Sequence, residues 1–398
     1  AVRFIFFEFA NKFIPFFSMP VLASLLTQED FGLAATLFSS VNFVMFFILL
    51  GTNSYLVIKF PALDDNEFDI LINNILGLIF VTTSLATLCA LVFYILELSN
   101  FSILFVISLI AFGLSKALST LISSYFIAAK RAGHFGFFQT LMALITYLPS
   151  ILMLKYINAN VLVFYIAILA TFLTNTAIFF YVWFWRLKVS SVNIQKIISL
   201  FWYGLKLLPH SLASSARGAF DAIIIAYFFT FEQVSVYLVA LQFASIPSLI
   251  GVSYNRYFSQ FCYDKFTKSK NANLTKVILF RGFYGVILVS MSAVLISIFI
   301  QTLIGFLYPE SFSSAADIVQ IMIWFPIFQS LYFMIVPALF FQEKNRTVSV
   351  ISVLALVFHL LVLLYFVTSG SFELCARAIV ISWAFQFAAV FFTRLKKS

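Results

Sequence analysis

The sequence predicts an all-α integral membrane protein of about twelve transmembrane helices in two six-helix lobes. Its 398 residues are 63% hydrophobic and only 10% charged, whereas soluble domains carry roughly 25% charged residues. Apolar runs long enough to cross a bilayer recur along the whole chain, and no loop between them could hold a folded soluble domain. Features near the start of the chain also recur about 200 residues later, which indicates two related halves.

The expected spans follow from the apolar runs and the polar or Pro/Gly-containing turns between them. Pro15 and Pro20 interrupt the first span, and Pro326 and Pro337 are expected to kink the tenth. A basic linker at 186–199 separates an N-terminal lobe, 1–185, from a C-terminal lobe, 200–398. In the first half the expected spans are 2–26, 31–57, 70–96, 101–128, 137–154 and 161–185. In the second half they are 206–229, 236–254, 282–300, 315–341, 347–367 and 372–393.

The distribution of Lys and Arg predicts the orientation. Seventeen of them fall in loops on the side of the C-terminus, and only Lys155 falls on the opposite side. Cytoplasmic loops carry such an excess, so both termini are expected in the cytoplasm and the number of spans is even. The same rule explains the net charge of +9 and argues against a nucleic-acid partner.

The two halves are predicted to be copies of one unit. Lys12-Phe-Ile-Pro15 corresponds to Lys206-Leu-Leu-Pro209, and each motif begins a charged span that ends in a Thr-x-Glu turn. Six spans per copy give two parallel copies related by a pseudo-two-fold axis along the membrane normal. Two such lobes around a central cavity suit alternating access.

Span 206–229 carries an unusual number of polar groups for a membrane helix. At 100° per residue they share roughly a quarter of the helix circumference. A charge at the bilayer centre costs ~2.5–3.5 kcal/mol, so this stripe is expected to face a polar interior. It indicates a substrate or ion path; the alternative is a structural salt bridge, with Asp221 as the permanent partner of Arg217. The polar groups are Lys206, His210, Ser214, Arg217 and Asp221.

Two stretches resemble the openings of the two halves of bacterial polysaccharide exporters. The first is Asn11-Lys-Phe-Ile-Pro-Phe-Phe-Ser-Met-Pro20 followed by Glu29-Asp-Phe-Gly32. The second is Leu208-Pro-His-Ser with Asp221-Ala-Ile-Ile-Ile and Val236-Tyr237. In these stretches the chain resembles O-antigen flippases (Wzx-type) of the multidrug/oligosaccharidyl-lipid/polysaccharide (MOP) superfamily. Relatives often place Arg directly after the Asp, but here Ala222 follows Asp221.

The resemblance implies a V-shaped pair of lobes in the bacterial inner membrane. It further implies transfer of an undecaprenyl-diphosphate-linked sugar repeat unit to the periplasmic leaflet, with membrane lipids and polysaccharide assembly proteins as partners. Mid-span cations outnumber carboxylates, which suits a diphosphate. Candidate substrate-binding residues are Arg217, Lys206, Lys12, Arg377 and Lys116, the last two of which could instead snorkel to an interface. Candidates for coupling to H⁺ or Na⁺ are Asp221, Glu8 and His210, whereas His359 is expected to have a packing role.

Two other function classes compete with a flippase. A multidrug exporter of the same superfamily would be expected to have an acidic cavity, and the mid-span balance here is basic. A membrane glycosyltransferase or polymerase needs large outer loops, whereas the outer turns here are short, so no enzymatic activity is expected. The three scattered cysteines form neither a disulfide framework nor a metal site, and no cofactor motif is present.

Overall fold

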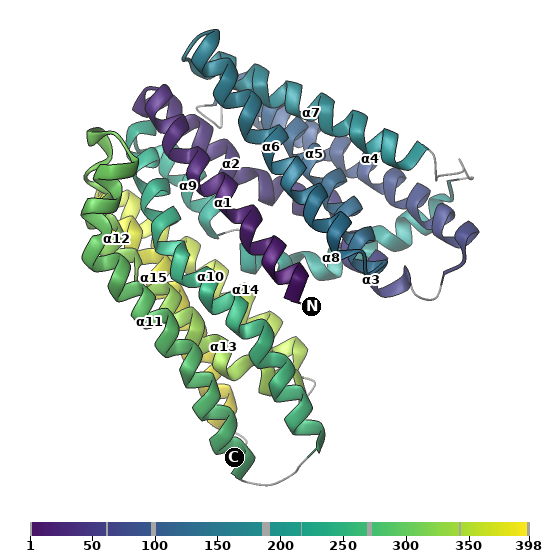
Figure 1. Ribbon diagram of the computed structural model, residues 1–398, viewed down its shortest axis with the longest axis vertical. Coiled ribbons are helices and arrows are strands. Elements are labelled where there is room, and N and C mark those ends of the chain that lie inside the picture. Colours follow the sequence, from purple (N-terminus) through teal and green to yellow (C-terminus); the bar gives the residue numbers. More distant parts are fainter. Residues whose placement is uncertain are drawn as a thin grey trace. The chain divides into compact units, whose positions relative to one another are not determined.

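The computed structural model is helical throughout the residues that it describes (Figure 1). The backbone is described over 2–60, 63–96, 101–184, 192–215, 217–268, 273–341 and 344–395. Within these ranges, the side chains at 2–10, 183–184, 207–215, 260, 263–268, 273–279, 345 and 394–395 lie outside the description. The chain divides into two compact units, Ala1–Ala219 and Phe220–Ser398.

The first unit is a bundle of helices, several of which begin at a side-chain cap. Thr27 accepts a hydrogen bond from the backbone of Asp30, and Ser102 accepts one from the backbone of Phe105. Asp64 and Glu67 form a reciprocal capping box, so in these three helices a polar turn ends the loop where an apolar run begins. The helices are α1 Val2–Leu25, α2 Gln28–Leu49, α3 Thr52–Lys59, α4 Asp65–Ile95, α5 Ile103–Ala128, α6 Ala132–Tyr156, α7 Val161–Phe184 and α8 Ile194–Ser215, with the start of α9 Arg217–Phe228.

The second unit contains the rest of α9 and the C-terminal helices. The helix α10 packs against α11 and α13, and α14 packs against α15. The segment between the predicted spans 236–254 and 282–300, expected to be a loop, is largely helical where described, because α10 continues to Lys268 and α11 begins at Asn273. An apolar run marks only the part of a helix that crosses the membrane, and the helix can continue beyond that run with polar residues. The elements are α10 Phe231–Lys268, α11 Asn273–Leu307, the 3-10 turn η2 Glu310–Phe312, α12 Ala315–Met322, α13 Phe325–Phe341, α14 Asn345–Thr368 and α15 Phe372–Leu395.

Two predicted spans are each built from two helices. Span 31–57 divides at Leu50 and Gly51, which both adopt left-handed backbone conformations, with φ of 47° and 71°. Span 315–341 divides between α12 and α13, where Pro326 occupies the first turn of α13. Proline fits there because a first-turn residue has no intrahelical acceptor for its backbone N–H.

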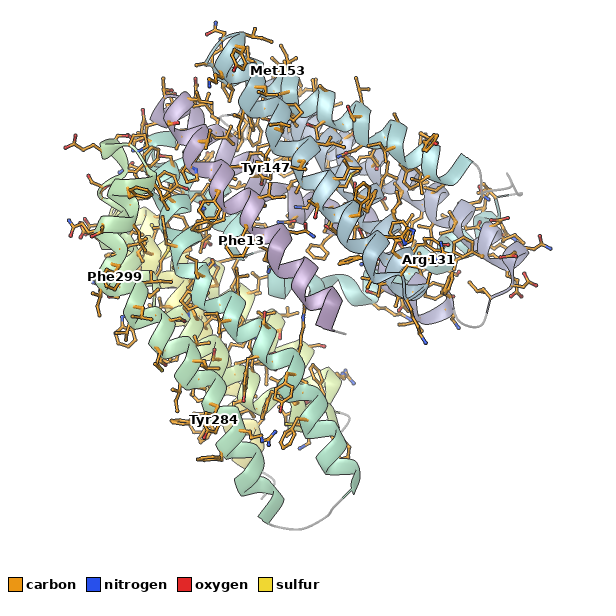
Figure 2. The ribbon with its side chains drawn as sticks, viewed as in Figure 1. Phe13, Arg131, Tyr147, Met153, Tyr284 and Phe299 are labelled. Atoms are coloured by element: carbon orange, nitrogen blue, oxygen red, sulfur yellow. The ribbon has the colours of Figure 1, made fainter. Side chains whose placement is uncertain are left out.

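Ten helical segments among the described residues are long and apolar enough to cross a membrane. Their outward faces carry large apolar side chains, as Figure 2 shows for Tyr284 and Phe299 of α11. A soluble domain would not expose so many large apolar groups, so these faces are suited to lipid. The helices α1, α8 and α9, which contain the first and seventh predicted spans, are not among the ten.

The boundary between the compact units lies beyond the predicted linker at 186–199. The helix α8 packs against α2 and α4, and it therefore belongs to the first unit together with the first residues of α9. The closest approach is at Gly204, where an added Cβ would lie 2.0 Å from the carbonyl oxygen of Leu50. A side chain at this position would push α8 away from the break between α2 and α3.

We expect Gly204→Ala to destabilise the protein by ~1–3 kcal/mol, because overpacking against a fixed backbone atom forces helices apart. Thermal unfolding in detergent should show a lower midpoint than for wild type. Gly133→Ala is the matched control, since nothing lies within 4 Å of its added Cβ. Equal midpoints for the two variants would contradict the close contact at Gly204.

Candidate functional site

A buried carboxylate in the second unit is held by side chains from two other helices. Asp221 of α9, Tyr237 of α10 and His359 of α14 are all fully buried. The Tyr237 hydroxyl donates to Oδ2 of Asp221 at 2.6 Å. Nε2 of His359 lies 2.5 Å from Oδ1 of Asp221. Both carboxylate oxygens therefore have a partner within the apolar interior of the unit.

Nδ1 of His359 is buried, and it has no hydrogen-bond partner among the residues that the structure describes. One ring nitrogen is thus unsatisfied wherever the proton lies, which carries a desolvation cost. The buried thiol of Cys375 on α15 is a further titratable group that interacts electrostatically with Asp221. The carboxylate of Asp221 is therefore surrounded by polar side chains from three other helices.

Arg217, another charged residue of the predicted stripe, is also buried, whereas Lys206 is exposed. Its exposed fraction is 4%, at the start of α9 and in the first compact unit. The neighbouring carbonyl of Gly218 accepts a hydrogen bond from Ser39 of α2 at 3.1 Å. A guanidinium in this position is a fixed positive charge, because arginine stays protonated in proteins.

The remaining predicted site residues are distributed over both units. Lys116 of α5 is half-buried and lines a cavity in the first unit. Lys12 of α1 and Lys206 of α8 are exposed in the same unit, and Arg377 of α15 is exposed in the second. The side chains of Glu8 and His210 lie outside the described residues.

The structure gives His359 a role that its sequence position did not suggest. His359 is fully buried, as the expected packing role requires, and in addition it pairs with Asp221 across 138 residues of sequence. The sequence did contain a signal, because a histidine and an aspartate in separate apolar spans each need a polar partner. Tyr237 stood within a family-like motif but was not predicted as a partner of Asp221.

The long apolar helices and their apolar outward faces define a multi-pass membrane protein. Comparison with known families agrees with this class. The family described as polysaccharide biosynthesis protein matches residues 4–261, and the chain belongs to this family. No curated protein matches the sequence.

Solved structures show the same fold at low sequence identity. Lipid II flippase MurJ, in an inward closed conformation, is 11% identical with a TM-score of 0.76, covering 99% of this chain and 88% of the other. An inward-facing MATE multidrug transporter of the MOP superfamily is 11% identical with a TM-score of 0.69, and the match covers 97% of this chain and 94% of the other. The MATE multidrug transporter DinF-BH is 11% identical with a TM-score of 0.61, covering 98% and 95%.

These matches confirm the resemblance and the helical MOP-type fold inferred from sequence. The neighbours are flippases and transporters, which agrees with the prediction that the chain is not an enzyme. A flippase or exporter is the function class that the family and the fold support.

Proposed function

We propose that the protein moves an undecaprenyl-diphosphate-linked oligosaccharide repeat unit from the cytoplasmic to the periplasmic leaflet of a bacterial inner membrane. Membrane lipids surround it, and polysaccharide assembly proteins receive its product. The observation that carries the proposal is the buried Arg217 of a chain in the polysaccharide biosynthesis family. A permanently charged guanidinium inside apolar helices suits an anionic cargo, and its planar donors match the oxygens of a diphosphate.

The proposal also assigns roles to the exposed cations of the two compact units. Lys12 and Lys206 begin the matched charged segments of the two halves, and both are exposed within the first unit. We assign them to contacts with the diphosphate as it moves, and Arg377 to a contact in the second unit. Exposed ammonium groups can follow a moving anion because their stems are flexible.

Proton binding at Asp221 and His359 is our proposal for energy coupling. Asp221 accepts a hydrogen bond from Tyr237 and pairs with His359, so a proton gained or lost there alters contacts among α9, α10 and α14. Glu8 and His210 are further coupling candidates. Na⁺ is the alternative ion, and it would use the carboxylate of Asp221 as a ligand.

The proposal is tested in a strain that lacks its own O-antigen flippase, using long-chain surface polysaccharide as the readout. We expect the wild-type gene to restore long chains and the empty vector not to. Because flippases discriminate among repeat units, several host strains with different units should be tried. Restoration in none of them would contradict the proposed substrate class.

The multidrug-exporter alternative rests on the likeness in fold to MATE transporters. Efflux of a cationic dye from the same cells separates the two functions. The flippase proposal predicts no dye efflux above the vector control, because a cationic interior repels a cationic drug.

A further inference from the structure

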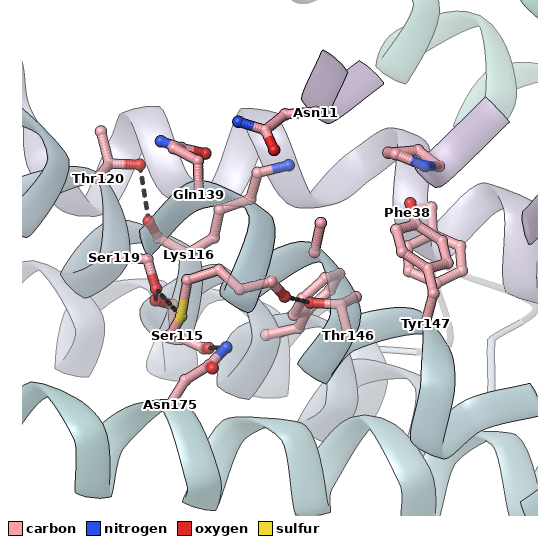
Figure 3. A pocket seen from close by; sticks show the side chains of 14 residues that line it. Asn11, Phe38, Ser115, Lys116, Ser119, Thr120, Gln139, Thr146, Tyr147 and Asn175 are labelled. Carbon is pink, nitrogen blue, oxygen red and sulfur yellow. Dashed lines mark hydrogen bonds between the residues drawn. The ribbon is translucent and has the colours of Figure 1, made fainter. Parts of the chain in front are cut away.

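The first unit contains a polar cavity that the lipid-diphosphate function does not explain. Its volume is about 190 Å³, far above the ~10–15 Å³ that a single water needs. Helices α1, α2, α5, α6 and α7 all contribute to its wall, and Figure 3 shows the Lys116 side chain extending across it toward Asn11. The wall also contains the amide of Gln139 and five hydroxyls: Ser115, Ser119, Thr120, Thr146 and Tyr147.

Buried polar atoms in this wall lack partners among the described residues. Asn175 donates through Nδ2 to Ser115 at 2.7 Å, but its Oδ1 is buried without a donor. Asn11 accepts through Oδ1 from Thr140 at 2.8 Å, but its Nδ2 is buried without an acceptor. Asn175 is only 5% exposed, so a missing partner is costly unless something in the cavity supplies it.

The charge of the cavity is positive among the described side chains. Lys116 supplies an ammonium, and no Asp or Glu whose side chain is described lines the wall. Glu8 lies one helical turn before Asn11 in α1, and its side chain is outside the description. A cation in a membrane helix needs an anionic partner, and a bound ligand can provide one.

The unpartnered atoms specify the chemistry of that ligand. The ammonium of Lys116 and Nδ2 of Asn11 require acceptors, as a carboxylate provides. Oδ1 of Asn175 requires a donor, as a hydroxyl provides and a simple anion does not. Phe38 stacks on Tyr147 at 5.1 Å and forms an aromatic surface at one end of the cavity. Donors, an acceptor and an aromatic surface together match a sugar ring that carries an acidic group.

We propose that this cavity binds an acidic sugar of the transported repeat unit, with its carboxylate on Lys116 and a ring hydroxyl on Asn175. The inference rests on the proposed function, because it assigns the sugar part of the same cargo. Lys116 therefore contacts the glycan, whereas Arg217 contacts the diphosphate.

Binding of free D-glucuronate to the purified protein tests this site without requiring transport. Isothermal titration should detect glucuronate, with weaker binding of D-glucose and of chloride. Lys116→Met should weaken glucuronate binding about tenfold to a hundredfold, as expected for loss of a charge-assisted hydrogen bond. Lys116→Arg should retain most of it, and it remains informative if the methionine variant does not fold. Lys155→Met is the matched control, because Lys155 is an exposed lysine of the same unit.

Several results would overturn the proposal. The first is the absence of glucuronate binding by the wild-type protein. The second is chloride binding as strong as glucuronate binding. The third is an equal loss of glucuronate binding in Lys116→Met and Lys155→Met. Glucuronate binding that appeared only in Glu8→Gln would show that Glu8 is the partner of Lys116, and it would overturn the site. Glucuronate binding by a protein that restores no surface polysaccharide would refute the proposed function while keeping the site.

Discussion

Replacing Arg217 by alanine is expected to reduce repeat-unit flipping by about tenfold to a hundredfold, the loss expected for a charge-assisted hydrogen bond. The guanidinium is buried at the start of α9. Alanine removes its charge and its planar donors together. Arg217→Lys should keep partial activity, because lysine supplies the charge but not the bidentate geometry. The measurement is the rate at which long-chain polysaccharide returns after induction of each variant in a flippase-deficient strain.

The control for Arg217→Ala must distinguish a loss of substrate binding from a loss of protein in the membrane. Arg131→Ala removes an exposed arginine of the same unit, and it should flip at the wild-type rate. Membrane abundance of every variant is measured by immunoblot in the same cells. Normal flipping by Arg217→Ala at normal abundance would rule out Arg217 as a substrate contact.

Replacing Asp221 by alanine is expected to have the second large effect, here on stability as well as on transport. The substitution leaves the Tyr237 hydroxyl and the ring of His359 without their acceptor in a fully buried place. Breaking a buried pair in this way costs ~3–5 kcal/mol. Thermal unfolding of the purified protein should show a clear drop in the midpoint. Asp317→Ala, at an exposed acid of the same unit, should leave the midpoint unchanged.

Asp221→Asn separates the structural role from the coupling role. The amide keeps an acceptor oxygen in the same place, so the protein should be more stable than Asp221→Ala. It cannot take up a proton at working pH, so transport driven by a proton gradient in proteoliposomes should be lost. Tyr237→Phe removes one hydrogen bond to Asp221 but leaves Asp221 and His359 in place. Transport by this variant should therefore still be driven by the proton gradient. Proton-driven transport by Asp221→Asn would exclude Asp221 as the coupling group.

The membrane class of the protein was predictable because it depends on local sequence. A run of apolar residues crosses a bilayer wherever it falls in the chain, and the polar caps Thr27, Asp64 and Ser102 mark the starts of three of the helices. The ends of the helices were less predictable. The helix α10 continues to Lys268 because a helix can extend beyond the apolar segment that crosses the membrane.

The candidate sites were only half predictable. Helical periodicity placed Arg217 and Asp221 on one face of one span, and the sequence therefore identified a charged segment. Periodicity says which residues share a face, but not which helix packs against it. The neighbours of Asp221 come from α10 and α14, and the nearest hydrogen-bonded one is 16 residues away in sequence.

The sequence by itself determined a multi-pass helical transport protein with charged residues inside its spans, since hydropathy and charge are properties of single segments. The tertiary structure decided the partners of those charges. It brought His359 and Tyr237 to Asp221, and it enclosed Lys116 with Asn11 and Asn175 in one cavity. The physical reason is that a polar group within apolar helices must be satisfied by other helices, and only their packing determines which ones come within hydrogen-bonding distance.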